Sequence, residues 1–282
     1  MIGPTVITQS ISARKYKDKY GNEWQYHPRS DHHSKTACWA ILFDVLQHCP
    51  ELRAHAADGR VGFGINHQMT DFQTEKRKDL DLVLCIPRTG GESMAGSFAE
   101  LATHYDLVLD DETQEDLMCL PAIPRAEVGD VLVAVEAKAC MTAHSKAAPR
   151  FFDELTSAWM CINGSSERAI AVGFSMVNAA EVFVSPLMNK ELIAPGAAVV
   201  NEHRQPAATQ KIQEAFRRLR LRGTSSERGY DAMGMVTVDA RNDGSPMTIA
   251  PEPLSVPPSD PYEYEMMIRR IASIYSNRFS AL

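Results

Sequence analysis

The sequence lacks the features that distinguish secreted, disulfide-rich and membrane-spanning proteins. Its six cysteines include no Cys-x-x-Cys pair, and most lie in apolar segments, which indicates reduced core thiols rather than disulfides or a zinc site. No apolar run approaches the roughly 20 residues that span a bilayer. The first residues also lack a basic start followed by an apolar core, the pattern of a secretion signal. We therefore expect a soluble, cytoplasmic protein with no membrane partner.

An excess of positive charge is also lacking. The 282 residues contain 29 lysines and arginines against 36 aspartates and glutamates, a formal net charge of −7. This balance gives no overall attraction to nucleic acid, so binding of a polyanion would need a local basic surface. The apolar content of 44% is ordinary for a globular protein, and the chain is long enough to bury a full core.

The apolar segments that are present indicate an α/β protein. Helical spacing predicts a helix over residues 35–56 that breaks at Pro50, and an amphipathic helix over 148–162. Short strands are predicted at 59–69, 76–87, 130–138, 169–177 and 181–186. Because two of these strands are apolar on both sides, we expect a central mixed β-sheet with helices on both faces.

Three segments make up the expected organisation. Residues 1–34 contain a basic and aromatic hairpin over 14–29, residues 35–186 form the α/β core, and residues 187–282 form a C-terminal helical and hairpin elaboration docked on it. An insertion at about 88–130 is expected to hold a helix, a short strand at "DLVL" (106–109) and an acidic loop. The C-terminal elements are expected to be a helix over 206–222, a hairpin over 233–249 and a final helix of about 18 residues.

The strand over 130–138 ends in Glu136-Ala137-Lys138. Side chains alternate along a strand that rises about 3.3 Å per residue, so Glu136 and Lys138 project from one face while Ala137 points to the other. A single carboxylate would hold a magnesium ion only loosely, so a second is needed. Asp81 is the best donor, because it leads "DLVL" (81–84) in a strand that can lie beside Glu136.

This order of elements resembles the PD-(D/E)XK nuclease superfamily and its restriction-endonuclease-like fold. The matching residues are Asp81, Glu136 and Lys138, followed by a helix and an apolar strand, and the resemblance covers roughly residues 35–185. It implies magnesium-dependent hydrolysis of phosphodiester bonds, with Mn²⁺ as a substitute for Mg²⁺. Asp81, Glu136 and the backbone carbonyl of Ala137 would hold the metal, which lowers the pKa of a bound water, and Lys138 would orient that water.

The resemblance also implies a partner and a role. We expect a DNA endonuclease of the restriction or anti-phage defence type that acts on double-stranded DNA, and a homodimer, because double-strand cleavage by this fold commonly goes with dimers. The alternative is a non-catalytic nucleic-acid-binding or assembly subunit of a larger nuclease complex, which the acidic net charge supports. A third alternative is an unrelated α/β protein in which the Glu-x-Lys pattern is incidental.

The identity of the second carboxylate is open. Asp81 precedes Glu136 by 55 residues, a long separation for this family, whereas Asp106 leads an identical "DLVL" 30 residues before Glu136. Asp79 lies two residues before Asp81 on the same strand face, and Asp44 in the first core helix is a candidate third acid. We favour Asp81 because "KRKDLDLVL" places basic residues beside it, where a phosphate backbone would pass.

Other residues are candidates for contact with the substrate. His144 and Lys146 follow the Glu-x-Lys strand and Arg150 begins the next helix, although a loop histidine and solvated surface cations are equally ordinary. The run "FRRLRLR" places arginines at a helix end, where they either grip DNA or match the helix dipole: Arg217, Arg218, Arg220 and Arg222. The adjacent His32 and His33 are expected to point in different directions and not to share a metal.

Overall fold

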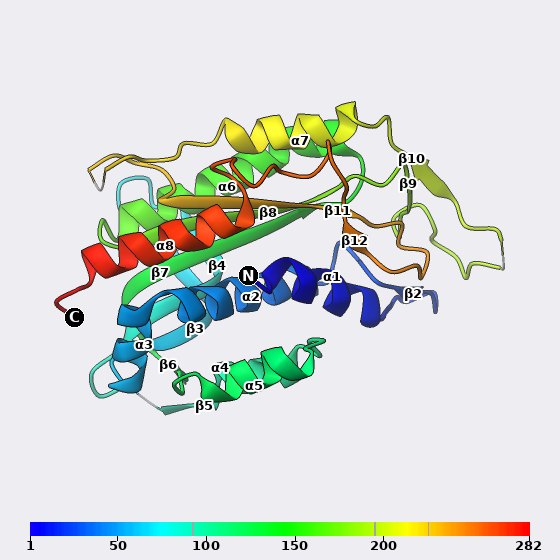
Figure 1. The fold of residues 1–282 in the computed structure, drawn as a ribbon. Helices are drawn as coiled ribbons and strands as arrows, with labels where there is room; N and C mark the ends of the chain where they lie inside the picture. Colours follow the sequence, from blue (N-terminus) through cyan, green and yellow to red (C-terminus); the bar gives the residue numbers. More distant parts are fainter. Residues whose placement is uncertain (92, 195, 225) are drawn as a thin grey trace.

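An eight-stranded mixed β-sheet forms the centre of the computed structural model, which describes residues 1–91, 93–194, 196–224 and 226–282 (Figure 1). The order across the sheet is β12-β11-β8-β7-β4-β3-β6-β5. The bounds of these strands are β3 Gly62–Thr70, β4 Arg77–Pro87, β5 Ser93–Ser97, β6 Pro124–Ala126, β7 Val128–Cys140, β8 Ile170–Asn178, β11 Ala232–Asp239 and β12 Thr248–Ile249. The expected α/β class with a central mixed sheet is confirmed.

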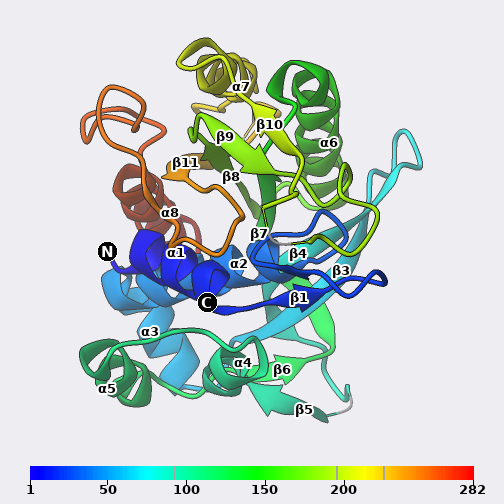
Figure 2. The same cartoon turned by 90° about the vertical axis from the view of Figure 1, so that its right-hand side faces the viewer.

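Helices cover both faces of this sheet, as the strands that are apolar on both sides predict. One face lies against α2 (His32–His48) and α8 (Tyr264–Arg278), and α1 (Gly3–Ala13) packs on α2. The other face lies against α6 (His144–Ser165), on which α7 (Ala207–Arg217) packs (Figure 2). The buried apolar residues accordingly form two clusters, one on each side of the sheet.

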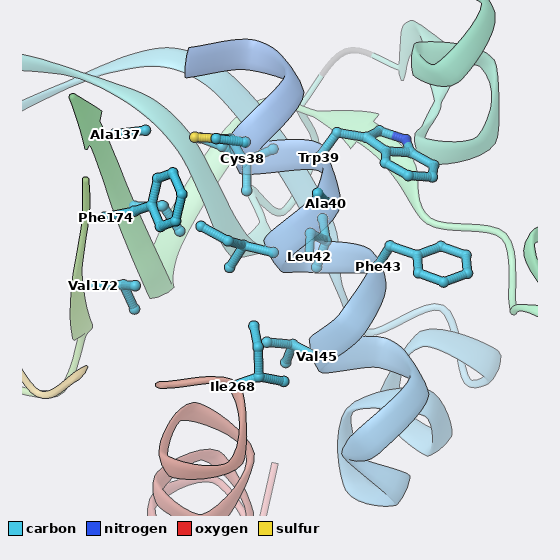
Figure 3. Close-up of a cluster of buried hydrophobic side chains, with 14 of the residues drawn as sticks. Cys38, Trp39, Ala40, Leu42, Phe43, Val45, Ala137, Val172, Phe174 and Ile268 are labelled. Atoms are coloured by element: carbon cyan, nitrogen blue, oxygen red, sulfur yellow. The ribbon is translucent and has the colours of Figure 1, made fainter. Parts of the chain in front are cut away.

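Helix α2 is buried on nearly every side. In Figure 3, Leu42 lies toward Phe174 of β8, whereas Trp39 points the opposite way. Trp39 stacks on Phe98 of α4 (Phe98–His104) with 5.3 Å between ring centroids, and its Nε1–H donates to the Phe98 carbonyl oxygen at 3.2 Å. Because α2 is covered on one side by the sheet and on the other by α4, it is held rigidly beside the strand end that carries Glu136.

Strand β7 is paired along both of its edges. It runs parallel to β8, with Lys138 opposite Ser175, and antiparallel to β4, where the pairing reaches Leu82 opposite Val135. Its residues from Val131 to Ala137 are buried, which explains the near-continuous apolar run that precedes the charged pair.

Two expectations for the insertion are wrong. Residues 106–109 form no strand, and Asp106 adopts a left-handed φ of 53° after α4. The acidic stretch is not a loop but helix α5 (Asp111–Cys119). The Asp110 carboxylate accepts a hydrogen bond from the Thr113 N–H at 2.8 Å, and Leu117 is buried. The N-terminal cap and one buried leucine outweigh the polar composition.

Two helices have other bounds than expected. Helix α6 begins at His144, so that His144 and Lys146 lie in its first turn rather than in a preceding loop, and Pro149 lies inside the helix. Helix α7 ends at Arg217, so the remaining arginines of "FRRLRLR" follow the helix instead of lining its last two turns.

The C-terminal third contributes to the central sheet. The expected hairpin is present, because β11 pairs antiparallel with β12, but β11 also runs parallel to β8 with Gly234 opposite Phe174. A large part of the expected elaboration is therefore core. Figure 1 shows α8, in red, lying along β11.

The remaining elements lie around the core. The hairpin β1 (Tyr16–Lys17) and β2 (Glu23–Trp24) is present as expected, but helix α1 before it was not predicted. Helix α3 (Pro50–Ala57) begins at the predicted break, and β9 (Val182–Val184) pairs with β10 (Val200–Glu202) in a separate small sheet. Within the described ranges, no helix combines the length and the apolar character needed to cross a bilayer.

Candidate active site

The site lies where β4 and β7 separate. The pairing of these strands reaches Leu82 and Val135, and immediately beyond it Asp81 lies beside the Glu136-Ala137-Lys138 segment. The backbone N–H of Ala137 donates to Asp81 Oδ2 at 3.1 Å. A side-chain carboxylate thus takes the place of a strand partner, and Asp81 lies next to Glu136, as the sequence predicts.

At Asp81, the side chains of β4 change from one face of the sheet to the other, and this irregularity positions Asp81. Leu80 packs in the cluster beneath α6 and Leu82 in the cluster beneath α2, although residues two apart share a face in a regular strand. Opposite Asp81, Asn66 of β3 adopts a left-handed φ of 52°. The buried Lys35 of α2 donates to Asn66 Oδ1 and, at 3.3 Å, to the Asp81 carbonyl oxygen. The Asp81 carbonyl and the Asn66 side chain are therefore both hydrogen-bonded from the α2 side.

Glu136 is the most buried charge of the site, with 1% of its surface exposed. Its Oε1 accepts from Lys138 Nζ at 2.9 Å and from Lys78 Nζ at 3.0 Å. Its Oε2 is buried and has no hydrogen-bond partner among the described residues. Burial raises the pKa of Glu136 and the Asp81 carboxylate raises it further, against the opposing effect of the two lysines.

Lys138 joins the strand to helix α6. Its Nζ lies 3.5 Å from a carboxylate oxygen of Glu154, and Glu154 also accepts from Arg150 at 2.6 Å. Burial works to lower the pKa of Lys138, but Glu136, Asp81 and Glu154 together raise it, so the ammonium group stays protonated. With 26% of its side chain exposed, Lys138 reaches solvent, while Glu136 does not.

A cavity of about 660 Å³ opens beside Asp81, Ala137 and Lys138, and the buried Glu136 is not part of its lining. Strands β4 and β7, helix α6, residues 28–34 and residues 183–187 form its walls. Its charged lining consists of four basic side chains, Arg29, Lys78, Lys138 and Arg150, against the acidic Asp31, Asp81 and Glu154. His33 also lines it, and burial lowers the pKa of this imidazole to about 4, so it is neutral at physiological pH.

The donor set fits a hard divalent cation. Asp81 lies near enough to Glu136 to raise its pKa, and Glu136 Oε2 is buried with no hydrogen-bond partner among the described residues. In the described part of the chain, no group of three or more histidine, cysteine, aspartate or glutamate side chains could hold a metal. Mg²⁺ commonly takes one or two carboxylates and completes its shell with water and phosphate oxygens, whereas zinc needs more protein ligands.

The other candidate acids lie elsewhere. Asp79 is exposed and accepts from Gln68 Nε2 at 3.1 Å. Asp106 is 72% exposed and pairs with Arg14 at 3.8 Å. Asp44 is buried and accepts from the backbone N–H groups of Ile2 and Gly3, so it caps helix α1. None of the three is part of the cavity lining.

His144 and Lys146 differ in their surroundings. His144 is buried, its Nε2 lies 2.8 Å from the Asn178 carbonyl oxygen, and burial lowers its pKa to about 4. This imidazole is a structural group of α6 and cannot contact a phosphate. Lys146 is exposed but does not line the cavity, and Arg150 is exposed and does.

The arginines of "FRRLRLR" do not form one continuous basic surface. Arg217 makes two hydrogen bonds to Asp260, at 2.9 and 2.6 Å, and Arg222 is buried in an ion pair with Asp231. Arg218 lies over the Phe152 ring, and Arg220 is exposed. The expectation of a four-arginine DNA contact is wrong for Arg222, because 2% of its side chain is exposed.

Three residues of the site were not found from the sequence. Lys35, Lys78 and Glu154 surround Asp81, Glu136 and Lys138, but they come from α2, β4 and α6. The basic run before Asp81 was a signal for Lys78, and the spacing of Arg150 and Glu154 by four was a signal for an ion pair on a helix. Lys35 had no such signal, since its partners are distant in sequence. The two adjacent histidines point apart, as expected: His32 contacts Arg14, and His33 lines the cavity.

No protein-family model, curated protein or solved structure matches the chain. The chemistry of the site is two neighbouring carboxylates, one with a buried oxygen unpartnered among the described residues, and a protonated lysine that lines the cavity. Such a set can hold a cation, bind a phosphate group next to it, and place a charged donor beside the reacting atoms.

Proposed function

We propose that the protein is a magnesium-dependent deoxyribonuclease that hydrolyses phosphodiester bonds in double-stranded DNA, with an active site of the PD-(D/E)XK type. The observation that carries the proposal is Glu136, a carboxylate 1% exposed, with one oxygen unpartnered among the described residues and with Asp81 beside it. A buried carboxylate beside a second negative charge is favoured in its ionised form only with compensating positive charge. Lys78 and Lys138 supply part of it at Oε1, and a bound cation would supply the rest.

The residues of the chain have separate roles in this proposal. Asp81 and Glu136 hold the ion, which, when bound, lowers the pKa of a coordinated water and takes up charge on the phosphoryl oxygens. Lys138 orients the attacking water and donates to the developing oxyanion. Glu136, Asp81 and Glu154 raise the pKa of Lys138, and Glu154 holds the Lys138 ammonium group at the cavity wall. Arg29 and Arg150 on the cavity wall contact the neighbouring phosphates.

Plasmid DNA with Mg²⁺ tests this function. We expect Lys138→Ala to lower the rate of cleavage at least about 100-fold, as does the loss of one oxyanion-stabilising donor, with the circular dichroism spectrum unchanged. Asp81→Asn should abolish cleavage as well. Lys211→Ala, which removes an exposed lysine from α7, is the matched control and should cleave like the wild type. Undiminished cleavage by Lys138→Ala would disprove the assignment.

One observation favours a second candidate, a non-catalytic nucleic-acid-binding or assembly subunit. Lys78 and Lys138 both contact Glu136 Oε1 and already neutralise part of the local charge. In this alternative the two ammonium groups take the place of the metal. Calorimetric titration with Mn²⁺ separates the two, because the nuclease binds the ion through Asp81 and Glu136 and the subunit gives no heat. A homodimer stays an expectation of the resemblance.

A further inference from the structure

A second hollow continues from the catalytic cavity toward the N-terminal hairpin. It has a volume of about 340 Å³, and we call it the hairpin hollow; the residues used below are Tyr16, Lys19, Tyr20, His27, Arg29 and Lys190. Arg29, Pro186 and Leu187 line both spaces. The two spaces are therefore adjacent, and a chain molecule bound in the cavity can extend past Arg29 to the hairpin hollow. Figure 2 shows the hairpin and the loop after β9 on the same side of the molecule.

The hairpin is held in place by its own hydrogen bonds. The Asp18 carboxylate accepts from the Tyr20 N–H at 2.8 Å, the Asn22 N–H at 3.0 Å and Trp24 Nε1 at 2.8 Å. Asn22 then bonds residues of the loop after β9, donating to the Glu191 carbonyl oxygen at 2.8 Å. The hollow is thus preformed, and the one acidic side chain in its lining is already satisfied.

Aromatic rings form its walls. Tyr16 stacks on His27 with 4.4 Å between ring centroids and 25° between the planes. Tyr16 and Tyr20 are 36% and 37% exposed, far more than the buried tyrosines of the core. Aromatic rings left half-exposed beside a preformed hollow offer faces on which a flat molecule can stack.

The charges around these rings are positive. Lys19, Arg29 and Lys190 line the hollow against Asp18 alone, and Lys19 Nζ lies 4.9 Å from the centre of the Tyr20 ring. Cations spaced around aromatic faces match a nucleotide, whose base is flat and whose phosphates are anionic. A base inside a duplex has both faces covered by its neighbours, so only an unpaired base can stack on a side chain.

We propose that the hairpin hollow binds an unpaired nucleobase of the DNA strand that passes through the catalytic cavity, by stacking on Tyr16 and Tyr20. The proposal rests on the proposed nuclease function for the identity of the polymer. It specifies the substrate further: the DNA presents a single-stranded segment next to the phosphodiester that is cut.

Fluorescence anisotropy without divalent cations tests the hollow apart from catalysis. The probes are a fluorescein-labelled single-stranded oligonucleotide, a duplex with a single-stranded overhang and a blunt duplex of the same sequence. The wild type should bind the first two more tightly than the blunt duplex. Tyr16→Ala with Tyr20→Ala should weaken binding of the first two about tenfold or more, as loss of base stacking does, and leave the blunt duplex unchanged.

Two further variants keep the test decisive. Tyr16→Phe with Tyr20→Phe retains both rings and should bind like the wild type, and Met118→Ala, which removes an exposed side chain from α5, is the control for a surface change elsewhere. Equal binding of all three probes by the wild type, or no loss in the double alanine variant, would overturn the proposal. Because binding is measured without a metal, undiminished cleavage of plasmid DNA by Lys138→Ala would disprove the nuclease assignment and leave this binding result separate.

Discussion

Glu136 is an ionisable carboxyl group that water cannot reach, and its titration should be visible in the stability of the protein. Its folded pKa lies above the ordinary 4.5, first because of burial and then because of Asp81. Between 4.5 and the folded pKa, the folded protein retains a proton that the unfolded chain has released. The free energy of unfolding therefore falls as the pH rises through this window, by about 1.4 kcal/mol for each pH unit that separates the two pKa values.

Urea denaturation of the wild type and of Glu136→Gln, from about pH 4 to about pH 8 in the absence of divalent cations, measures this fall as the difference between the two proteins. Saturating Mg²⁺ favours the ionised carboxylate and should flatten it. Glu154→Gln is the internal control: Arg150 and Lys138 hold the pKa of Glu154 below its usual range despite burial, so the effect of this variant should be flat above about pH 5 and change, with opposite sign, only below the ordinary 4.5. A difference that does not depend on pH would contradict the burial of Glu136.

At the residue scale, the sequence predicted the charges that meet on one strand or on adjacent strands. Glu136 and Lys138 are two apart on β7, and Asp81 lies on the neighbouring β4, so alternation and a plausible pairing were enough to bring them together. Lys35 comes from α2, on the opposite face of the sheet from α6, and it reaches Asn66 and Asp81 only because the side chains of β4 change face at Asp81. No local sequence pattern encodes this change of face, since it depends on Leu80 packing beneath α6 and Leu82 packing beneath α2.

At the scale of elements, helix α1 depends on a carboxylate from α2. Its N-terminus has no side-chain cap of its own, and Asp44 accepts from the Ile2 N–H at 3.1 Å and from the Gly3 N–H at 2.9 Å. Asp44→Ala leaves buried N–H groups without partners and should lower the free energy of unfolding by about 1–3 kcal/mol.

Asp44→Asn keeps an acceptor oxygen and is the matched variant. It should be destabilised less than Asp44→Ala, and its Mg²⁺-dependent cleavage of plasmid DNA should equal that of the wild type. Denaturation and the cleavage assay together check this. A folded Asp44→Asn protein without activity would indicate that Asp44 belongs to the metal site, which would contradict its role as the cap of α1.

The two copies of "DLVL" show why elements with the same letters can differ. Residues 82–84 pair with both β3 and β7, whereas residues 106–109 follow α4 and pair with no described strand. A strand forms where a partner edge is available, and the local sequence does not contain that information. Helix α5 was missed for a related reason, because its cap at Asp110 and one buried leucine stabilise a segment with almost no apolar face.

At the scale of the whole molecule, the C-terminal third completes the core. Asp231 precedes β11 with 3% of its side chain exposed, and it accepts from Arg222 Nη2 at 2.5 Å, from Arg278 Nη2 at 2.7 Å and from the Ala171 N–H at 2.8 Å. This one carboxylate joins β8, β11 and the end of α8. Sequence patterns predicted these elements separately, but no pattern indicated that distant arginines would meet on Asp231.

Asp231→Asn should therefore destabilise the entire protein. It leaves two guanidinium groups without their counterion, and removal of one partner from a buried pair costs about 3–5 kcal/mol. Despite burial, Arg222 and Arg278 lower the pKa of Asp231 below its ordinary 3.8, so this stability is present above 3.8 and is lost as the pH falls through the folded pKa. Asp260→Asn is the control, because its pair with Arg217 is partly exposed and should contribute about 1 kcal/mol or less.

Urea unfolding at neutral pH, followed by tryptophan fluorescence and by circular dichroism, should give one coincident transition with a lower midpoint in Asp231→Asn. Two separate transitions, with the loss confined to the second, would show instead that β11 and α8 are a docked module.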